Sequence, residues 1–252
     1  MDETAGTLTV TMVRCSTLVL EWEGTRFLTD PWFAMHLRGL PCFRRPGCKA
    51  TEVPALDAVL VSHLHPDHFD RAAMGRMEPT PQRVIFPPDA LKALGKVEPG
   101  WGELALWEST SVGPVEIWAV PGPHTFPGPE EANFVLRLPD WGQVFFGGDA
   151  RFEPDVIQAI ADRFGPFRLA LLPVGGTRIF GKRTVMAPED AEKAADMLQA
   201  QTVIPIHEGG IWMSVPPLSL HPGRATHLVQ ALEERGEPNR VLVLQEGQTV
   251  TL

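Results

Sequence analysis

The hydrophobic residues follow two different periods in the two halves of the chain. Up to about residue 150, short apolar or alternating runs are bounded by glycine and proline, a pattern that predicts strands. A turn at Glu23-Gly24 joins two of these runs into a hairpin. The predicted strands cover residues 8–13, 17–22, 25–29, 58–61, 84–86, 103–107, 115–120, 133–138 and 144–146.

The second half adds apolar stripes with helical spacing. They predict helices over residues 154–164, 188–200 and 225–232, with strands at 169–172, 202–206, 240–244 and 249–252. The helix at 188 has Pro188 in its first position and Glu189 and Asp190 in its first turn, as a helix N-terminus favours. Strands first, then strands separated by helices, predict an α/β fold of two sheets with helices outside, an αββα sandwich in a single domain, 1–252.

Composition narrows the class of protein. The chain has 252 residues, of which 44% are hydrophobic and 21% charged, which excludes a disordered chain. No apolar run approaches the roughly 20 residues of a membrane span, and the acidic start at Met1-Asp2-Glu3 lacks the features of a secretory signal. We therefore expect a soluble, cytoplasmic protein. The net charge of -9 argues against a nucleic-acid partner.

The chain holds three cysteines, Cys15, Cys42 and Cys48. An odd, low count is not typical of a disulfide scaffold, so we expect free thiols, although a Cys42–Cys48 pair stays open.

A dense group of metal-ligand residues follows the run at 58–61. In His63-Leu64-His65-Pro66-Asp67-His68, three histidines and a carboxylate fall within six residues. His63 and His65 are two apart, so in extended geometry their rings leave on the same face and reach one metal. After the proline, Asp67 and His68 point in a new direction and can approach a second ion. Imidazole and carboxylate ligands suit zinc, manganese or iron.

Three further residues of ligand type occupy similar places. His124, Asp149 and His207 each follow the end of a predicted strand. Taken singly, they have ordinary alternatives: a loop histidine, a turn or cap aspartate, and a hydrogen-bonded core histidine. Beside the first group they predict one rim where strand ends deliver side chains to a shared site.

The ordered series resembles the metallo-β-lactamase superfamily, whose signature is HxHxDH followed by a histidine, an aspartate and a histidine. The strand ending at Thr29-Asp30-Pro31 is similar to its first motif. The segments 28–33, 171–175 and 186–191 resemble a narrower branch, which holds L-ascorbate-6-phosphate lactonase and N-acyl-phosphatidylethanolamine-hydrolysing phospholipase D.

The resemblance implies a role for each residue. One metal would be held by His63, His65 and His124, and a second by Asp67, His68 and His207. Asp149 would bridge both ions, and Asp30 would orient the histidine loop through hydrogen bonds. The alternative interpretation of Asp30 is a simple turn residue before proline. Two divalent ions, zinc first with manganese or iron as alternatives, would activate a water, and Asp67 is also a candidate proton acceptor.

Two acid-free basic segments, 31–50 and 174–187, point to the substrate. Arginines on rim loops would clamp an anionic group, whereas the alternative is a pair of solvated loops. The candidate substrate contacts are Arg44, Arg45, Arg178, Lys182 and His221. His221 is either an outer acid or contact, or an ordinary surface histidine.

These observations predict a dinuclear metal-dependent hydrolase that acts on an ester, lactone or phosphodiester bond of a small, anionic substrate. A phospholipase-D-like phosphodiesterase is the first alternative. A non-catalytic metal-bound binding or sensor module is the second, and an iron redox variant a third. The sequence leaves the oligomeric state open, a homo-oligomer included.

Overall fold

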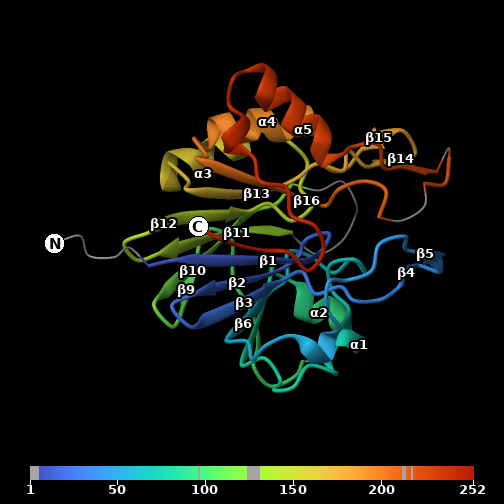
Figure 1. The fold of residues 1–252 in the computed structure, drawn as a ribbon. Coiled ribbons are helices and arrows are strands. Elements are labelled where there is room, and N and C mark those ends of the chain that lie inside the picture. The colour runs from blue at the N-terminus through green and yellow to red at the C-terminus, as the bar shows by residue number, and fades with distance from the viewer. Residues whose placement is uncertain (1–5, 96, 124–130, 212–213, 217) are drawn as a thin grey trace.

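Two β-sheets pack face to face in the computed structural model, which describes residues 6–95, 97–123, 131–211, 214–216 and 218–252 (Figure 1). In spatial order the first sheet contains β18 (Thr249–Thr251), β1 (Leu8–Arg14), β2 (Thr17–Trp22), β3 (Thr25–Thr29), β6 (Ala58–Leu60), β7 (Arg83–Phe86) and β8 (Trp101–Glu103). The second contains β16 (Thr202–Ile206), β13 (Leu169–Pro173), β12 (Gly142–Phe146), β11 (Ala132–Leu138), β10 (Val115–Pro121) and β9 (Ser109–Val112).

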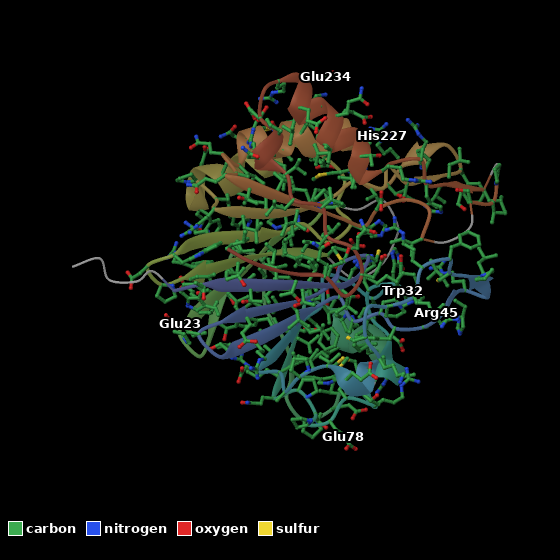
Figure 2. The ribbon with its side chains drawn as sticks, in the orientation of Figure 1. Glu23, Trp32, Arg45, Glu78, His227 and Glu234 are labelled. Atoms are coloured by element: carbon green, nitrogen blue, oxygen red, sulfur yellow. The ribbon has the colours of Figure 1, made fainter. Side chains whose placement is uncertain are left out.

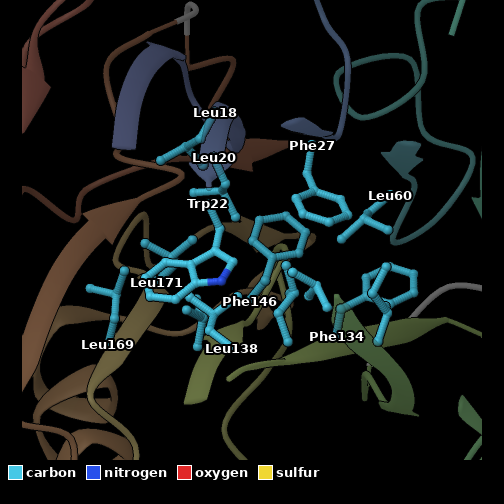
Figure 3. Packing of buried hydrophobic residues seen from close by; sticks show 14 of the residues in the cluster. Leu18, Leu20, Trp22, Phe27, Leu60, Phe134, Leu138, Phe146, Leu169 and Leu171 are labelled. Atoms are coloured by element: carbon cyan, nitrogen blue, oxygen red, sulfur yellow. The ribbon is translucent and has the colours of Figure 1, made fainter. Parts of the chain in front are cut away.

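The core between the sheets comes from alternate strand positions. Trp22 and Phe27 of the first sheet meet Phe134 and Phe146 of the second, and all four are buried (Figure 3). Successive side chains of a strand point to opposite faces, so the other faces of both sheets need separate covers.

Helices supply those covers. The second sheet carries α3 (Pro154–Phe164), α4 (Pro188–Met197) and α5 (Ala225–Glu234), and these pack in their own apolar cluster. The first sheet carries the short α1 (Arg71–Met74) and α2 (Ala90–Leu94), near the 3₁₀ turn η1 (Ala50–Glu52). Figure 1 shows the four layers in order, which confirms the predicted αββα sandwich.

The prediction of a strand at 103–107 is wrong. The strand β8 ends at Glu103, and a turn follows in which Trp107 has φ +66°. Among the described strands β8 pairs with β7 alone, in register from Val84–Trp101 to Phe86–Glu103, and β7 ends at Phe86. The apolar alternation continues past the point where the partner strand has ended, so no ladder forms.

The prediction of a strand at 240–244 is also wrong. A 3₁₀ turn, η2 (Pro238–Arg240), precedes a single bridge between Val203 and Val241. Leu242 donates to the Val203 carbonyl, which faces the outer edge of β16. The next position of β16 that faces this edge is Pro205, which has no N–H to donate, and the ladder stops there.

Two small hairpins were not predicted and project from one side of the sandwich (Figure 1). One joins β4 (His36–Leu37) to β5 (Leu40–Pro41). The other joins β14 (Arg178–Ile179) to β15 (Lys182–Arg183), and β17 (Ser219–Leu220) pairs with β14. Strands of two residues are too short to show a hydrophobic period.

All three cysteines are free thiols, as expected. Among the described helices, none has the length and apolar character needed to cross a bilayer.

Candidate metal centre

Strand ends from both sheets meet at one rim of the sandwich. β3 and β6 run parallel, and they are followed by Asp30 and by the segment from Ser62 to His68. β12, β13 and β16 run parallel in the other sheet, and Asp149 and His207 follow two of them. Parallel strands present their carboxyl ends at the same edge, so side chains distant in sequence converge here.

The described residues form three overlapping groups whose ligand atoms lie within 4.8 Å of one another. The groups are His63, His65 and Glu131; His63, His68 and Asp149; and Asp67, His68 and His207. The third group is the set that the family resemblance assigns to the second metal. His124, assigned to the first metal, lies outside the described residues.

Asp149 belongs to the second of these groups, and its two oxygens face different imidazoles. Its Oδ1 is 3.6 Å from His63 Nε2. Its Oδ2 is 3.7 Å from His68 Nε2 and 3.9 Å from His207 Nε2. Two donors bound to one zinc ion at about 2.1 Å lie roughly 3–4 Å apart, so these separations leave space for an ion on either side of the carboxylate.

Asp30 fixes the start of the histidine segment. Its carboxylate accepts hydrogen bonds from the Ser62 backbone N–H and the Ser62 hydroxyl, each at 2.7 Å. Its Oδ2 also lies 2.6 Å from His68 Nδ1. A carboxylate on the remote nitrogen of an imidazole sets the ring's tautomer and orientation, which leaves His68 Nε2 to face the centre.

The backbone is strained at two of the residues on the rim. Asp30 has φ +34° and His207 has φ +47°, a region that non-glycine residues rarely adopt. A Cβ at Gly175 would lie 2.4 Å from the His207 carbonyl oxygen, so only glycine permits this close approach. Strain of this kind persists where the surrounding structure holds a functional geometry in place.

The electrostatics of the rim favour positive charge. Burial alone would lower the pKa of His68, but the carboxylates of Asp30 and Asp149 raise it to about 10. Burial, and then the charge of Asp149, raise the pKa of Glu131 to about 10. Burial opposes ionisation of Asp67 as well, yet the imidazoles of His207 and His68 hold its pKa well below the usual range. Crowded buried carboxylates of this kind are stabilised by a nearby cation.

The donor set fits a metal. His68 Nε2 is fully buried, and among the described residues no group hydrogen bonds to it. The carboxylates of Asp67 and Asp149 are the nearest acidic groups, at 3.9 and 3.7 Å, which is beyond hydrogen-bond length. A buried imidazole nitrogen whose other nitrogen is held by a carboxylate is typical of metal ligation.

Glu131 was not predicted as part of the site. Its Oε2 lies 3.9 Å from His63 Nδ1, which also contacts the Ser62 hydroxyl at 2.9 Å. Glu131 directly precedes β11, and β11 runs antiparallel to β12. Because the two strands are antiparallel, the start of β11 lies at the same rim as the end of β12. A polar residue directly before a strand is therefore also a sequence signal for a site residue.

A cavity of about 550 Å³ opens onto the rim. His65, Asp67, Asp149 and His207 line its floor, and His221 lines its wall. The remaining wall residues come from the two hairpins and the segments beside them: Leu37, Arg38, Leu40, Thr177, Ile179, Phe180, Thr184, Val185 and Ser219.

Of the five predicted substrate contacts, the structure brings His221 alone into the described cavity wall. Arg44 forms ion pairs with Glu208 at 2.8 Å and Glu246 at 3.3 Å. Arg45 and Lys182 are exposed, and the Arg178 guanidinium donates to the Gly181 carbonyl at 3.3 Å. Figure 2 shows Arg45 on the hairpin side of the sandwich. The cation that lines the cavity is Arg38, in the same acid-free segment as Arg44 and Arg45.

His221 is a buried, hydrogen-bonded histidine rather than a surface one. Its Nδ1 lies 3.0 Å from the Thr177 hydroxyl, and the residue is 6% exposed. Burial and the neighbouring His207 lower its pKa to about 4, so the imidazole is neutral at pH 7.

Known proteins match most of this chain in sequence. The family model described as "Beta-lactamase superfamily domain" matches residues 25–207. N-acyl-phosphatidylethanolamine-hydrolyzing phospholipase D 1 of Caenorhabditis elegans is 28% identical over 90% of the chain and 71% of its own length. A metal-dependent hydrolase of Thermococcus onnurineus is 27% identical over 90% of the chain and 92% of its own. Mycobacterium tuberculosis relatives, 30% identical, are matched over 62% of their length.

The solved structures agree on the fold. Igni18, a metallo hydrolase from Ignicoccus hospitalis, superposes with a TM-score of 0.72 over 98% of both chains at 21% identity. The phospholipase side of the predicted branch thus has a matching relative, whereas the lactonase side stays a prediction. This chain belongs to the metallo-β-lactamase superfamily and, within it, to the metal-dependent hydrolases.

Proposed function

We propose that the chain is a dinuclear metal-dependent hydrolase that cleaves an ester, lactone or phosphodiester bond of a small anionic molecule. The position of Asp149 carries this proposal, because one of its oxygens faces His63 at 3.6 Å and the other faces His68 and His207 at 3.7 and 3.9 Å. His63 and His65, with His124, would hold one ion. Asp67, His68 and His207 would hold the other, and Asp149 would contact both.

When bound, two divalent ions lower the pKa of water and polarise the oxygen of the scissile group. The residues of the chain hold and orient the reacting groups. Asp30 fixes the His68 ring through Nδ1, and Ser62 fixes His63 in the same way. Asp67 stays ionised at neutral pH because its pKa is strongly lowered, so it is a weak proton acceptor and better suited to be a ligand.

His221 would contact the substrate as a neutral imidazole. The Thr177 hydroxyl holds the ring at Nδ1, and His221 lines the cavity wall, so the imidazole would face a molecule bound in the cavity. A neutral ring in this position orients a polar group of the substrate without repelling the nearby ions.

A phospholipase-D-like phosphodiesterase is the second candidate. The nematode relative carries that activity in its name. The hairpins and the segment after β15 also give the cavity an apolar wall, with Leu37, Ile179, Phe180 and Val185. A diester with an apolar part would fit this wall.

The experiment that tests the proposal combines metal content with hydrolysis. Wild type and Asp149→Asn are purified without added metal, analysed for metals, and assayed on 4-nitrophenyl butyrate, a lactone and bis(4-nitrophenyl) phosphate. We expect about two equivalents of metal in wild type, a sharp fall in the variant, and loss of hydrolysis with it. The ratio of diester to ester activity separates the two candidates.

Asp162→Asn, an exposed aspartate on α3, is the matched control and should keep metal and activity. A folded wild type that takes up neither zinc nor manganese nor iron would refute the proposal. Two bound metals without hydrolysis across the panel would favour the binding or sensor module.

A further inference from the structure

The two hairpins above the cavity end in the same kind of turn. In each, two residues separate the last paired positions: Arg38-Gly39 between Leu37 and Leu40, and Phe180-Gly181 between Ile179 and Lys182. All four have positive φ, namely +48° and +84° in the first tip and +48° and +79° in the second. Two-residue loops with this geometry are type I′ turns.

The first position of each turn holds an unfavourable residue. Type I′ turns prefer asparagine, aspartate or glycine there, because other side chains resist positive φ. This chain places an arginine in one tip and a phenylalanine in the other. A strained residue at a cavity is an observation that supports a functional role, and both of these side chains line the cavity.

The surroundings suit two different parts of a ligand. Among the described residues, none pairs with Arg38 by a hydrogen bond or ion pair, in contrast to Arg44, which has two carboxylate partners. Phe180 is 75% exposed, and its neighbour Ile179 is half-buried in the cavity wall. Of seven exposed large apolar side chains in the described chain, four lie in or directly next to the strands β4, β14 and β17 or in the tips between them: Met35, Phe180, Leu218 and Leu220.

We propose that the two hairpin tips select the substrate, with Arg38 binding an anionic group and Phe180 covering an apolar portion. The substrate class is then an amphiphilic anion, whose polar end reaches the rim while its apolar part lies between the hairpins. The inference rests on the proposed function in one respect, that the substrate binds in this same cavity.

Binding, rather than turnover, provides the test. Octylphosphonate and methylphosphonate, which resist hydrolysis, are titrated into the purified protein by calorimetry. Both carry the same charged head, so the contribution of the metal ions cancels in the ratio of their dissociation constants. Burial of even part of the octyl chain should make octylphosphonate bind at least about tenfold more tightly.

Two variants separate the contributions of Phe180 and Arg38 to phosphonate binding. Phe180→Ser should weaken the binding of octylphosphonate roughly fivefold and leave the binding of methylphosphonate unchanged. Arg38→Gln should weaken the binding of both phosphonates roughly tenfold, as expected for loss of a charge-assisted contact. Phe43→Ser and Arg45→Gln, an exposed aromatic and an exposed cation outside the described cavity wall, are the matched controls and should change neither.

Equal affinity of wild type for the two phosphonates, or tip variants that behave like their controls, would overturn the inference. Thermal unfolding and metal content confirm that each variant is folded and loaded. The predicted binding pattern in a protein that hydrolyses nothing would leave the inference standing and refute the proposed function. Hydrolysis without the pattern would do the reverse.

Discussion

The rim of strand ends and the pair of hairpins above it are built on opposite principles. At the rim, His63, His68 and Asp149 are buried and held by the ends of strands from two sheets. The hairpins contain strands of two residues, and Phe180 at one tip is 75% exposed. Both regions hold residues with positive φ, but the rim is fixed by its surroundings, whereas no described atom lies within 4 Å of a Cβ built on the tip glycines Gly39 and Gly181.

This contrast separates chemistry from selection. Metal ligands have to be positioned within a fraction of an ångström, and rigid strand ends provide that precision. Loops on a rigid scaffold tolerate changes of sequence, which suits the choice of substrate. Perturbing the rim should therefore alter metal binding and stability strongly, and perturbing the tips should alter them little.

Metal removal should produce the largest effect. Ligand binding stabilises the folded state by about 4 kcal/mol when free metal is a thousandfold above its dissociation constant. Chelation of wild type should lower the free energy of unfolding by that order, measured by urea denaturation with and without metal. Arg38→Gln should show the same loss on chelation as wild type. A variant at a tip that abolished the metal effect would show that the two regions are not separate.

Asp30→Asn should produce the second largest effect. The amide keeps the shape of the buried carboxylate but loses its charge and one acceptor, so the His68 ring is no longer held through Nδ1. Loss of such a partner typically weakens metal binding tenfold to a hundredfold, about 1.4–2.7 kcal/mol. Competition with a chromophoric chelator measures this. Asp57→Asn, a carboxylate that accepts from Arg26 and Gln82, is the control, and an equal loss there would argue against a specific role for Asp30.

The contrast between strand ends and hairpins also explains which features of the fold and the site could be predicted from the sequence. The αββα layers and the convergence of His63, Asp149 and His207 follow from strand ends, because a hydrophobic period fixes where a strand stops. Glu131 was missed because its contact with His63 depends on how β11 pairs with β12. The prediction of a strand at 103–107 fails because the partner strand β7 ends first.

The substrate contacts were harder to predict for a related reason. Basic residues mark the right segments, but Arg38 alone among the described arginines lines the cavity, since pairing within a six-residue hairpin decides which side chain occupies the tip. Gly39 and Gly181 are the part of the turn signal that the sequence contains, whereas the arginine and phenylalanine before them are not typical of a type I′ turn.

His221 connects the two regions and should give the protein a pH dependence. Its pKa is lowered to about 4 in the folded protein, against an ordinary value of about 6.5. The unfolded chain therefore binds more protons between these values, and stability should fall as the pH drops from 7 to 4. His221→Gln should remove about 1–2 kcal/mol of that decline. Urea denaturation at pH 7 and pH 4.5 measures it, and His227→Gln, exposed on α5, is the control.

Relief of strain at a tip should give the smallest effect and the opposite sign. Asparagine tolerates positive φ better than arginine and is a preferred residue before glycine in a type I′ turn. Arg38→Asn should therefore raise the free energy of unfolding by about 0.5 kcal/mol, while phosphonate affinity falls. The reverse outcome, lower stability with unchanged affinity, would mean that Arg38 supports the hairpin itself. Gain of stability together with loss of binding would show that this chain keeps a strained turn in order to place a cation above the rim.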